Sequence, residues 1–154
     1  MIEFDDYKVK INGLQPTLVT LGGALKLEAA KKEIVVQILL EVNVAEEDSK
    51  FGLKLDEVLP AVEEIATMPH VRIKGLMTIA PFVENPEENR TVFAQLQKLS
   101  VDIRSKNIDN VSVDILSMGM SDDFADAIAA GSTMIRVGTA IFGARNYAKP
   151  HQNN

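Results

Sequence analysis

Residues 116–143 (LSMGMSDDFADAIAAGSTMIRVGTAIFG) combine glycines, hydroxyl side chains and an arginine in an arrangement that could bind an anion. Gly119 lets the backbone turn where a predicted strand, 113–118, gives way to a predicted helix, 121–130. Ser121 would be the N-cap of that helix, and the free backbone N–H groups of a helix N-terminus favour a phosphate dianion. For Ser121 taken alone, capping of its own helix is the simpler interpretation.

The segment 136–139 (RVGT) supplies a second set of donors, at the end of the last predicted strand, 133–137. Gly138 and Thr139 add two backbone N–H groups and a hydroxyl. In (β/α) barrels the phosphate site commonly lies in the loops after the last two strands, and both candidate loops follow the last two strands of this chain. Arg136 lies one alternation from Gly138 and should face the same side, where its charge needs a partner.

The other charged and nucleophilic residues form no second constellation. Asp122 and Asp123 favour the helix dipole but would repel a phosphate that they faced, so we expect them to point outward. The chain has no cysteine, which excludes disulfides, cysteine nucleophiles and thiolate metal sites. His70 and His151 are too isolated for a metal site or a nucleophile constellation.

Short β-branched runs alternate with helical patterns along the chain, and no hairpin dipeptide separates them. This order indicates right-handed βαβ units and a parallel sheet. A closed barrel of this kind needs eight strands and typically about 250 residues, so the chain forms an open sheet or part of a barrel. The near-continuous apolar run of 34–43 favours a strand buried on both faces. The expected strands are 17–21, 34–43, 71–79, 113–118 and 133–137.

Two helices are predicted with some detail. Pro60 should lie in the first turn of the helix that contains Val58 and Ile65, where proline is tolerated. The stretch 85–88 (NPEE) combines a cap residue, a proline at the first helical position and a glutamate three residues after the cap. The apolar face of the following helix is marked by Val92, Leu96, Leu99 and Ile103.

Composition limits the class of protein. The 154 residues suit one domain, 1–154, whose first 16 residues are weakly patterned. The net charge of −6, the absence of Trp and the lack of a basic run argue against a nucleic-acid partner. The longest apolar run, 34–40, is too short to span a membrane, and the acidic start does not look like a signal peptide. We therefore expect a cytoplasmic protein.

Residues 116–147 resemble the C-terminal signature of the YggS/PROSC family almost residue for residue. The stretches 41–44 (EVNV), 49–52 (SKFG) and 75–77 (GLM) are similar to earlier blocks of that family at proper spacing. The resemblance implies an alanine-racemase-like barrel that binds pyridoxal 5'-phosphate, without demonstrated racemase activity, and that is associated with vitamin B6 and amino-acid homeostasis. The five predicted strands would then correspond to the last five of eight.

The same resemblance implies roles for single residues. Ser121, Gly138 and Thr139 resemble the phosphate ligands of the family. Arg136 resembles the arginine set against the pyridine nitrogen of the cofactor, which would keep that nitrogen unprotonated and the ring a poorer electron sink. Such a ring suits a carrier better than a demanding catalyst.

Three further residues have two interpretations each. Met118 and Met77 resemble residues that line the cofactor pocket, but both are also explained as core fillers, and for Met77 that is the preferred interpretation. Asn43, at a strand end, could contact the ligand or satisfy a loop.

Three family blocks do not occur in this sequence, including the one that resembles Val-Ser-Lys and carries the Schiff-base lysine. We do not expect Lys26, Lys50 or Lys74 to replace that lysine, so the cofactor would be held non-covalently. Two alternatives stay open. The chain could be the partial barrel of a racemase-like enzyme that another chain completes, or a truncated fragment that binds nothing and only self-associates through its open sheet edge.

Added pyridoxal phosphate should therefore give no stoichiometric lysine adduct that borohydride can trap, because no lysine matches the family position. Absorbance spectra with and without borohydride, followed by mass spectrometry, measure this. One dominant modified lysine at low cofactor excess would contradict the expectation.

Overall fold

The computed structural model describes residues 30–47 and 51–143. The predicted strand 17–21 and the weakly patterned segment 1–16 lie outside the described residues. The elements, in chain order, are β1 (Val36–Glu41), α2 (Leu55–Ala66), β2 (Val71–Met77), η2 (Pro86–Asn89, a 3-10 helix), α3 (Arg90–Ser105), β3 (Val111–Ser117), α4 (Phe124–Ala129) and α5 (Thr139–Phe142).

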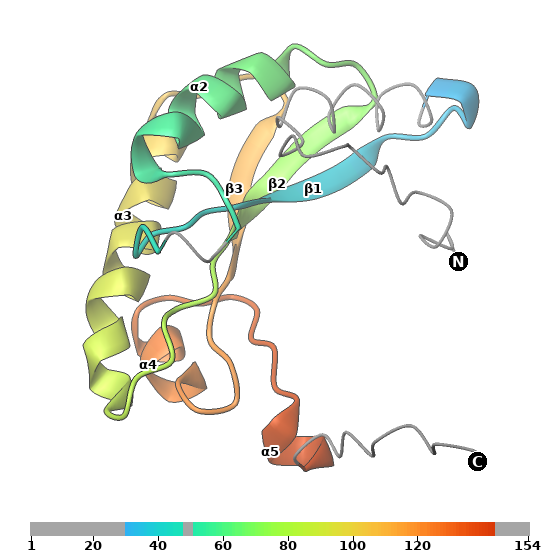
Figure 1. The fold of residues 1–154 in the computed structure, drawn as a ribbon. Helices are drawn as coiled ribbons and strands as arrows, with labels where there is room; N and C mark the ends of the chain where they lie inside the picture. The colour runs from blue at the N-terminus through green and yellow to red at the C-terminus, as the bar shows by residue number, and fades with distance from the viewer. Residues whose placement is uncertain (1–29, 48–50, 144–154) are drawn as a thin grey trace, which may run out of the picture.

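The three strands form one parallel sheet in the order β1-β2-β3. Helix α2 connects β1 to β2, and α3 connects β2 to β3, so each connection is a βαβ unit. Both helices lie on the same side of the sheet (Figure 1). The prediction of parallel (β/α) units is confirmed.

The predicted strand over 133–137 is wrong. Met134 makes an isolated bridge to Ser117, at the end of β3, and the next backbone hydrogen bond, from the Arg136 N–H to the Gly119 carbonyl, lies beyond that strand. A strand needs a continuous neighbour for its backbone groups, and here Thr133 and Met134 share one acceptor, the carbonyl of Leu116, at 3.0 and 3.1 Å. The described residues therefore contain three strands, where four had been expected among them.

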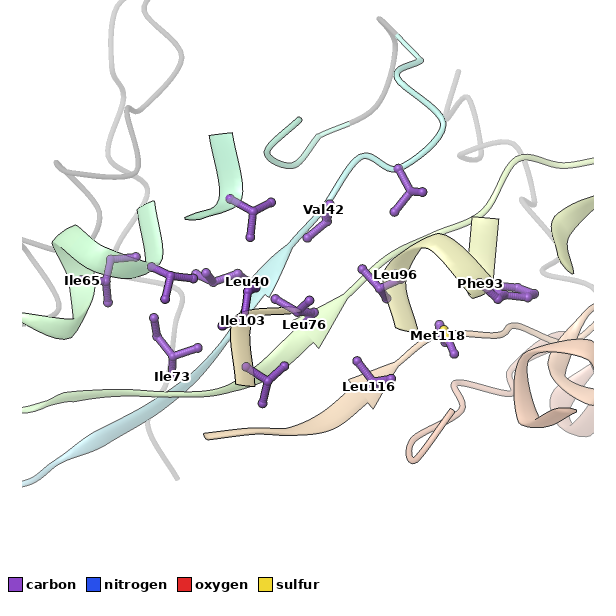
Figure 2. Packing of buried hydrophobic residues seen from close by; sticks show 14 of the residues in the cluster. Leu40, Val42, Ile65, Ile73, Leu76, Phe93, Leu96, Ile103, Leu116 and Met118 are labelled. Carbon is purple, nitrogen blue, oxygen red and sulfur yellow. The ribbon is translucent and has the colours of Figure 1, made fainter. Parts of the chain in front are cut away.

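The core lies between the sheet and the two long helices. Figure 2 shows apolar side chains of all three strands meeting those of α2 and α3 in one cluster. The predicted apolar face of α3 is confirmed: Leu96 and Ile103 are buried, and Val92 and Leu99 pack against the cluster. The core members are Leu40, Val42, Val44, Val58, Val62, Ile65, Val71, Ile73, Leu76, Phe93, Leu96, Ile103, Val113, Leu116, Met118 and Ala127.

Strand β1 is not buried on both faces among the described residues, contrary to the prediction from its apolar run. Leu40 and Val42 face the helices and are buried, but Gln37 is exposed and Leu39 is only half-buried. The described helices cover one face of the sheet, so the alternate residues of β1 meet no described element of comparable size.

The position predicted for Pro60 is also wrong. Helix α2 begins at Leu55, where the carboxylate of Glu57 accepts a hydrogen bond from the backbone N–H of Lys54 at 2.9 Å. Pro60 therefore lies in the second turn and deprives the carbonyl of Asp56 of its intrahelical donor. Both residues are exposed, so water can satisfy that carbonyl.

The predicted start of the long helix is confirmed, with one refinement. The side chain of Asn85 accepts a hydrogen bond from the backbone N–H of Glu87 at 3.2 Å, and Pro86 is the first helical residue. This first turn is the 3-10 helix η2, and α3 follows it directly at Arg90.

Strands β2 and β3 approach each other most closely at Gly75. A Cβ atom there would lie 1.9 Å from the backbone oxygen of Ile115 and 2.7 Å from its carbonyl carbon. Backbone atoms cannot rotate away, so a side chain at this position would force the two strands apart.

Gly75→Ala should lower the free energy of unfolding by about 3 kcal/mol or more, because the added methyl group has no space. Gly138→Ala is the matched control, since a Cβ at Gly138 meets nothing within 4 Å. It should change stability by no more than about 0.5 kcal/mol. Urea unfolding followed by circular dichroism measures both, and equal effects of the two substitutions would contradict the close approach.

Candidate functional site

The carboxyl ends of the three strands are tied together by one buried threonine. The Thr78 hydroxyl donates to the carbonyl of Val42 at 2.7 Å, and the Thr78 backbone N–H donates to the carbonyl of Ser117 at 3.1 Å. Thr78 thus joins the ends of β1 and β3 across β2. In open parallel α/β sheets, ligands bind outside this carboxyl edge.

Arg136 extends the same network. Its Nη1 donates to the Ser117 carbonyl at 2.9 Å and to the Ser117 hydroxyl, and its Nη2 donates to the Thr78 carbonyl at 2.8 Å. Burial lowers the pKa of the Arg136 guanidinium from its usual value, against the opposing charges of Glu41 and Asp123. The prediction that this charge needs a partner is confirmed, and the partners in the structure are strand-end oxygens.

Ser121 does not cap its own helix, so that interpretation is wrong. Residues 121–123 form a turn, and α4 begins at Phe124 with Asp123 in the N-cap position. The Ser121 hydroxyl oxygen instead accepts from the backbone N–H groups of Gly138 and Ala140, at 3.2 Å each. The structure therefore brings together the two segments that the sequence nominated as a phosphate site.

This arrangement can bind an anion oxygen. Two backbone N–H groups converge on one oxygen, and accepting both leaves the hydroxyl hydrogen of Ser121 free to donate. Gly138 and Thr139 are exposed, and there is open space at Gly138 where a side chain would otherwise stand. The donor that this arrangement leaves free for an anion is the Ser121 hydroxyl, beside the open space at Gly138.

Asp123 points inward, contrary to the prediction, whereas Asp122 is exposed as expected. The Asp123 carboxylate accepts from the backbone N–H of Met120 at 2.6 Å and from the side-chain amide of Asn89 at 2.9 Å. These two donors compensate the buried charge.

Sequence reasoning did not identify Asn89, although a signal for it exists. Asn89 precedes Phe93 and Leu96 at helical spacing, so it is a polar residue in line with the apolar face of α3. A buried polar residue needs a partner, and here the partner is Asp123.

The hydrogen bonds that join Ser121 to Gly138 and Ala140 do not include the other predicted site residues, Met118, Met77 and Asn43. Met118 is fully buried and belongs to the core, whereas Met77, at the end of β2, is half-buried. Asn43 closes a loop: its side-chain amide donates to the carbonyl of Glu47 at 2.8 Å, and its oxygen accepts from the Glu47 N–H at 3.2 Å. The loop interpretation of Asn43 is thus the one that these contacts support.

Residues 30–47 and 51–143 contain neither a candidate metal site nor a helix that could span a membrane. These residues contain no group of three or more His, Asp or Glu side chains placed to hold a metal ion. No helix in the same part of the chain is long and apolar enough to cross a membrane.

The sheet with its helices and its strand-end donors defines an α/β protein of the (β/α) type with a candidate anion site at the carboxyl edge. A family model described as alanine racemase, N-terminal domain, matches residues 3–146, and the chain belongs to that family. Within it, the resemblance to pyridoxal phosphate homeostasis proteins of the YggS/PROSC type is confirmed.

The curated relatives include two proteins named pyridoxal phosphate homeostasis protein. The one from Aquifex aeolicus is 40% identical over 127 residues, which cover 82% of this chain and 55% of the relative. The one from Escherichia coli K12 is 41% identical over 115 residues, which cover 74% of this chain and 47% of the relative. The chain thus spans about half the length of the curated relatives it matches.

Solved structures show the same fold. A protein from Bifidobacterium adolescentis matches with a TM-score of 0.75 at 36% identity, covering 80% of this chain and 49% of that one. PipY of Synechococcus elongatus, solved with PLP bound, matches with a TM-score of 0.69 at 28% identity, covering 80% of this chain and 56% of PipY. Alanine racemase from Corynebacterium glutamicum shares the fold, with a TM-score of 0.62 at 15% identity. The match covers 82% of this chain and 34% of the racemase chain.

Arg136→Met should lower the free energy of unfolding by about 1–3 kcal/mol, because strand-end oxygens lose a charged donor. Arg72→Met is the control: Arg72 is an exposed arginine of β2 with one long hydrogen bond, 3.4 Å, to Asn110. Its loss should cost no more than about 0.5 kcal/mol. Urea unfolding of the two variants tests the difference, and a cost for Arg136 no larger than that for Arg72 would refute the bridging role.

Proposed function

We propose that this chain binds pyridoxal 5'-phosphate non-covalently and serves in pyridoxal phosphate homeostasis. The observation that carries the proposal is the convergence of the Gly138 and Ala140 N–H groups on the Ser121 hydroxyl, beside exposed Gly138 and Thr139. Relatives named for pyridoxal phosphate homeostasis, and a PLP-bound relative of the same fold, support it.

The proposal assigns a task to each group. Ser121 and Thr139 would hold the phosphate through their hydroxyls and the Thr139 backbone N–H. Gly138, whose N–H donates to Ser121, would leave the space that the phosphate enters. Arg136, held against the strand ends by its hydrogen bonds to Ser117 and Thr78, would present its remaining N–H groups to the ring nitrogen. Bound pyridoxal phosphate supplies an electron sink in enzymes, and a cationic neighbour at the ring nitrogen weakens that property, which suits a carrier.

The proposal extends to the architecture and setting. The described sheet would be part of an eight-stranded barrel, residues 1–154 forming a single partial (β/α) domain. In the part of the chain that the structure describes, β1 pairs only with β2, and Val35, Ile141 and Phe142 are exposed. Open strand edges and exposed apolar side chains favour self-association. A cytoplasmic location is in keeping with the lack of cysteine.

Ser121→Ala should weaken binding of pyridoxal phosphate about ten- to a hundred-fold, because one hydrogen bond to a charged group is worth about 1.5–3 kcal/mol. Titration calorimetry with pyridoxal phosphate and with pyridoxal separates the phosphate contribution from that of the ring. Asp122→Asn is the control, since Asp122 is exposed, and it should bind as the wild type does or slightly better.

Two outcomes would count against the proposed function. Equal affinity of the wild type for pyridoxal phosphate and pyridoxal would mean that no phosphate site exists. An unchanged affinity of a folded Ser121→Ala variant would mean that the hydroxyl only joins two loops.

A further inference from the structure

The turn that carries Ser121 is closed by the side chain of Asp123. The carboxylate oxygen Oδ1 accepts from the backbone N–H of Met120 at 2.6 Å, and the Phe124 N–H donates to the Met120 carbonyl at 3.0 Å. The turn is entered through Gly119, whose φ of +96° and whose contacts leave no room for a Cβ. Residues 120–123 therefore form a short loop with a fixed entrance and joined ends.

The second carboxylate oxygen of Asp123 connects this loop to η2, which lies between β2 and α3. Oδ2 accepts from Nδ2 of Asn89 at 2.9 Å, and the same nitrogen donates to the carbonyl of Pro81 at 3.0 Å. Asn89 is 3% exposed and Asp123 is 8% exposed. Buried hydrogen bonds to a charged group are strong, and breaking one leaves a costly unpaired group. One buried pair thus joins the β3–α4 turn to η2 and to the β2–η2 loop.

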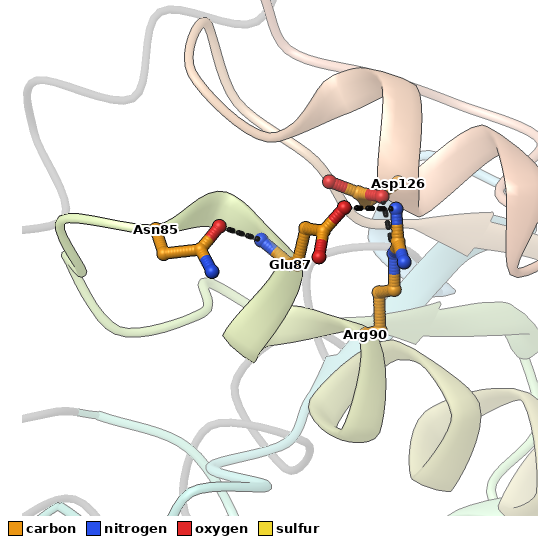
Figure 3. Close-up of polar contacts among 4 residues, drawn as sticks. All are labelled: Asn85, Glu87, Arg90 and Asp126. Atoms are coloured by element: carbon orange, nitrogen blue, oxygen red, sulfur yellow. Dashed lines mark hydrogen bonds and ion pairs between the residues drawn. The ribbon is translucent and has the colours of Figure 1, made fainter.

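A second contact, nearer the surface, joins the first residue of α3 to α4 and to η2. Arg90 Nε donates to Asp126 Oδ1 at 2.6 Å, and Arg90 Nη2 donates to Glu87 Oε1 at 3.0 Å (Figure 3). The Arg90 side chain is 58% exposed and that of Asp126 is 16% exposed, so the pair is solvated on its arginine side, and such ion pairs contribute less than buried ones. Adjacent residues, 89 and 90, therefore donate to two different carboxylates at the start of α4, and they differ in burial, which provides a comparison.

Ser121 lies within the loop that Asp123 closes, and its hydroxyl accepts from the Gly138 and Ala140 N–H groups. Within residues 51–143, the side-chain hydrogen bonds of Asn89 and Asp123 join them to Pro81, Met120 and each other, and none joins them to the 138–140 segment. We infer that Asn89 and Asp123 are positioning residues that hold Ser121 at the phosphate site. This inference rests on the proposed function.

The test is the selectivity for pyridoxal phosphate over pyridoxal, measured by calorimetry. Asp123→Asn puts an amide in place of the carboxylate, so that one donor or the other, from Met120 or Asn89, loses its acceptor. Affinity for pyridoxal phosphate should fall about ten-fold while affinity for pyridoxal stays the same. Asn89→Ala should reduce the selectivity to a similar extent, and this variant provides the test if Asp123→Asn does not fold.

An exchanged pair provides a rescue. Asn89→Asp combined with Asp123→Asn again sets one donor against one acceptor and keeps an oxygen for the Met120 N–H, but it leaves the Pro81 carbonyl without its donor, so part of the selectivity should return. Arg90→Gln should keep both affinities within about two-fold of the wild type, since the Arg90 side chain is solvated and a glutamine amide can still donate to Asp126.

The outcomes are separable. If the wild type itself does not prefer pyridoxal phosphate to pyridoxal, the proposed function fails and the inference with it. If the wild type does prefer it but folded Asp123→Asn and Asn89→Ala keep that preference, only the inference is overturned. A loss of selectivity in Arg90→Gln as large as in Asp123→Asn would also overturn it, because burial would then not distinguish the two contacts.

Discussion

Thr78 makes hydrogen bonds to three segments that meet at the carboxyl edge of the sheet. Its hydroxyl reaches Val42 after β1, its N–H reaches Ser117 at the end of β3, and its carbonyl accepts from Arg136. The side chain is 1% exposed, so none of these groups can turn to water instead. The candidate site stands on this junction, because β3 leads directly into the Ser121 turn and Arg136 leads directly into the Gly138 segment.

The two faces of the sheet differ in chemistry. The face under α2 and α3 holds the apolar cluster, whereas the opposite face carries charges, including Lys74 and Asp114, whose Nζ and Oδ2 are 3.6 Å apart on neighbouring strands. Lys74, one of the lysines not expected to replace the Schiff-base lysine, is 27% exposed beside this carboxylate.

The sequence was informative where a pattern depends on neighbours along the chain. The apolar face with Leu96 and Ile103, and the Asn85 cap before it, follow from helical spacing and local capping chemistry. It was misleading where the outcome depends on distant partners. The inward direction of Asp123 depends on Asn89, 34 residues away, and the 133–137 segment has strand-like residues without a continuous neighbour. The hydroxyl of Ser121 likewise found amides 17 and 19 residues further on.

The close approach at Gly75 coincides with a change of phase in two strands. In β2 the buried side chains are Val71 and Ile73 before it and Leu76 and Thr78 after it, and in β3 Val113 is followed by Leu116 and Met118. β1 has no such change, since Leu40 and Val42 keep one alternation. The register shift between Ile73 and Gly75 therefore determines which side chains of β2 face the helices beyond residue 75. Lys74 is the extra residue of this step, since Ile38 pairs with Ile73 and Leu39 pairs with Gly75. Deleting Lys74 would therefore give β1 and β2 a continuous register and would leave Leu76 and Thr78 on the helix side of the sheet.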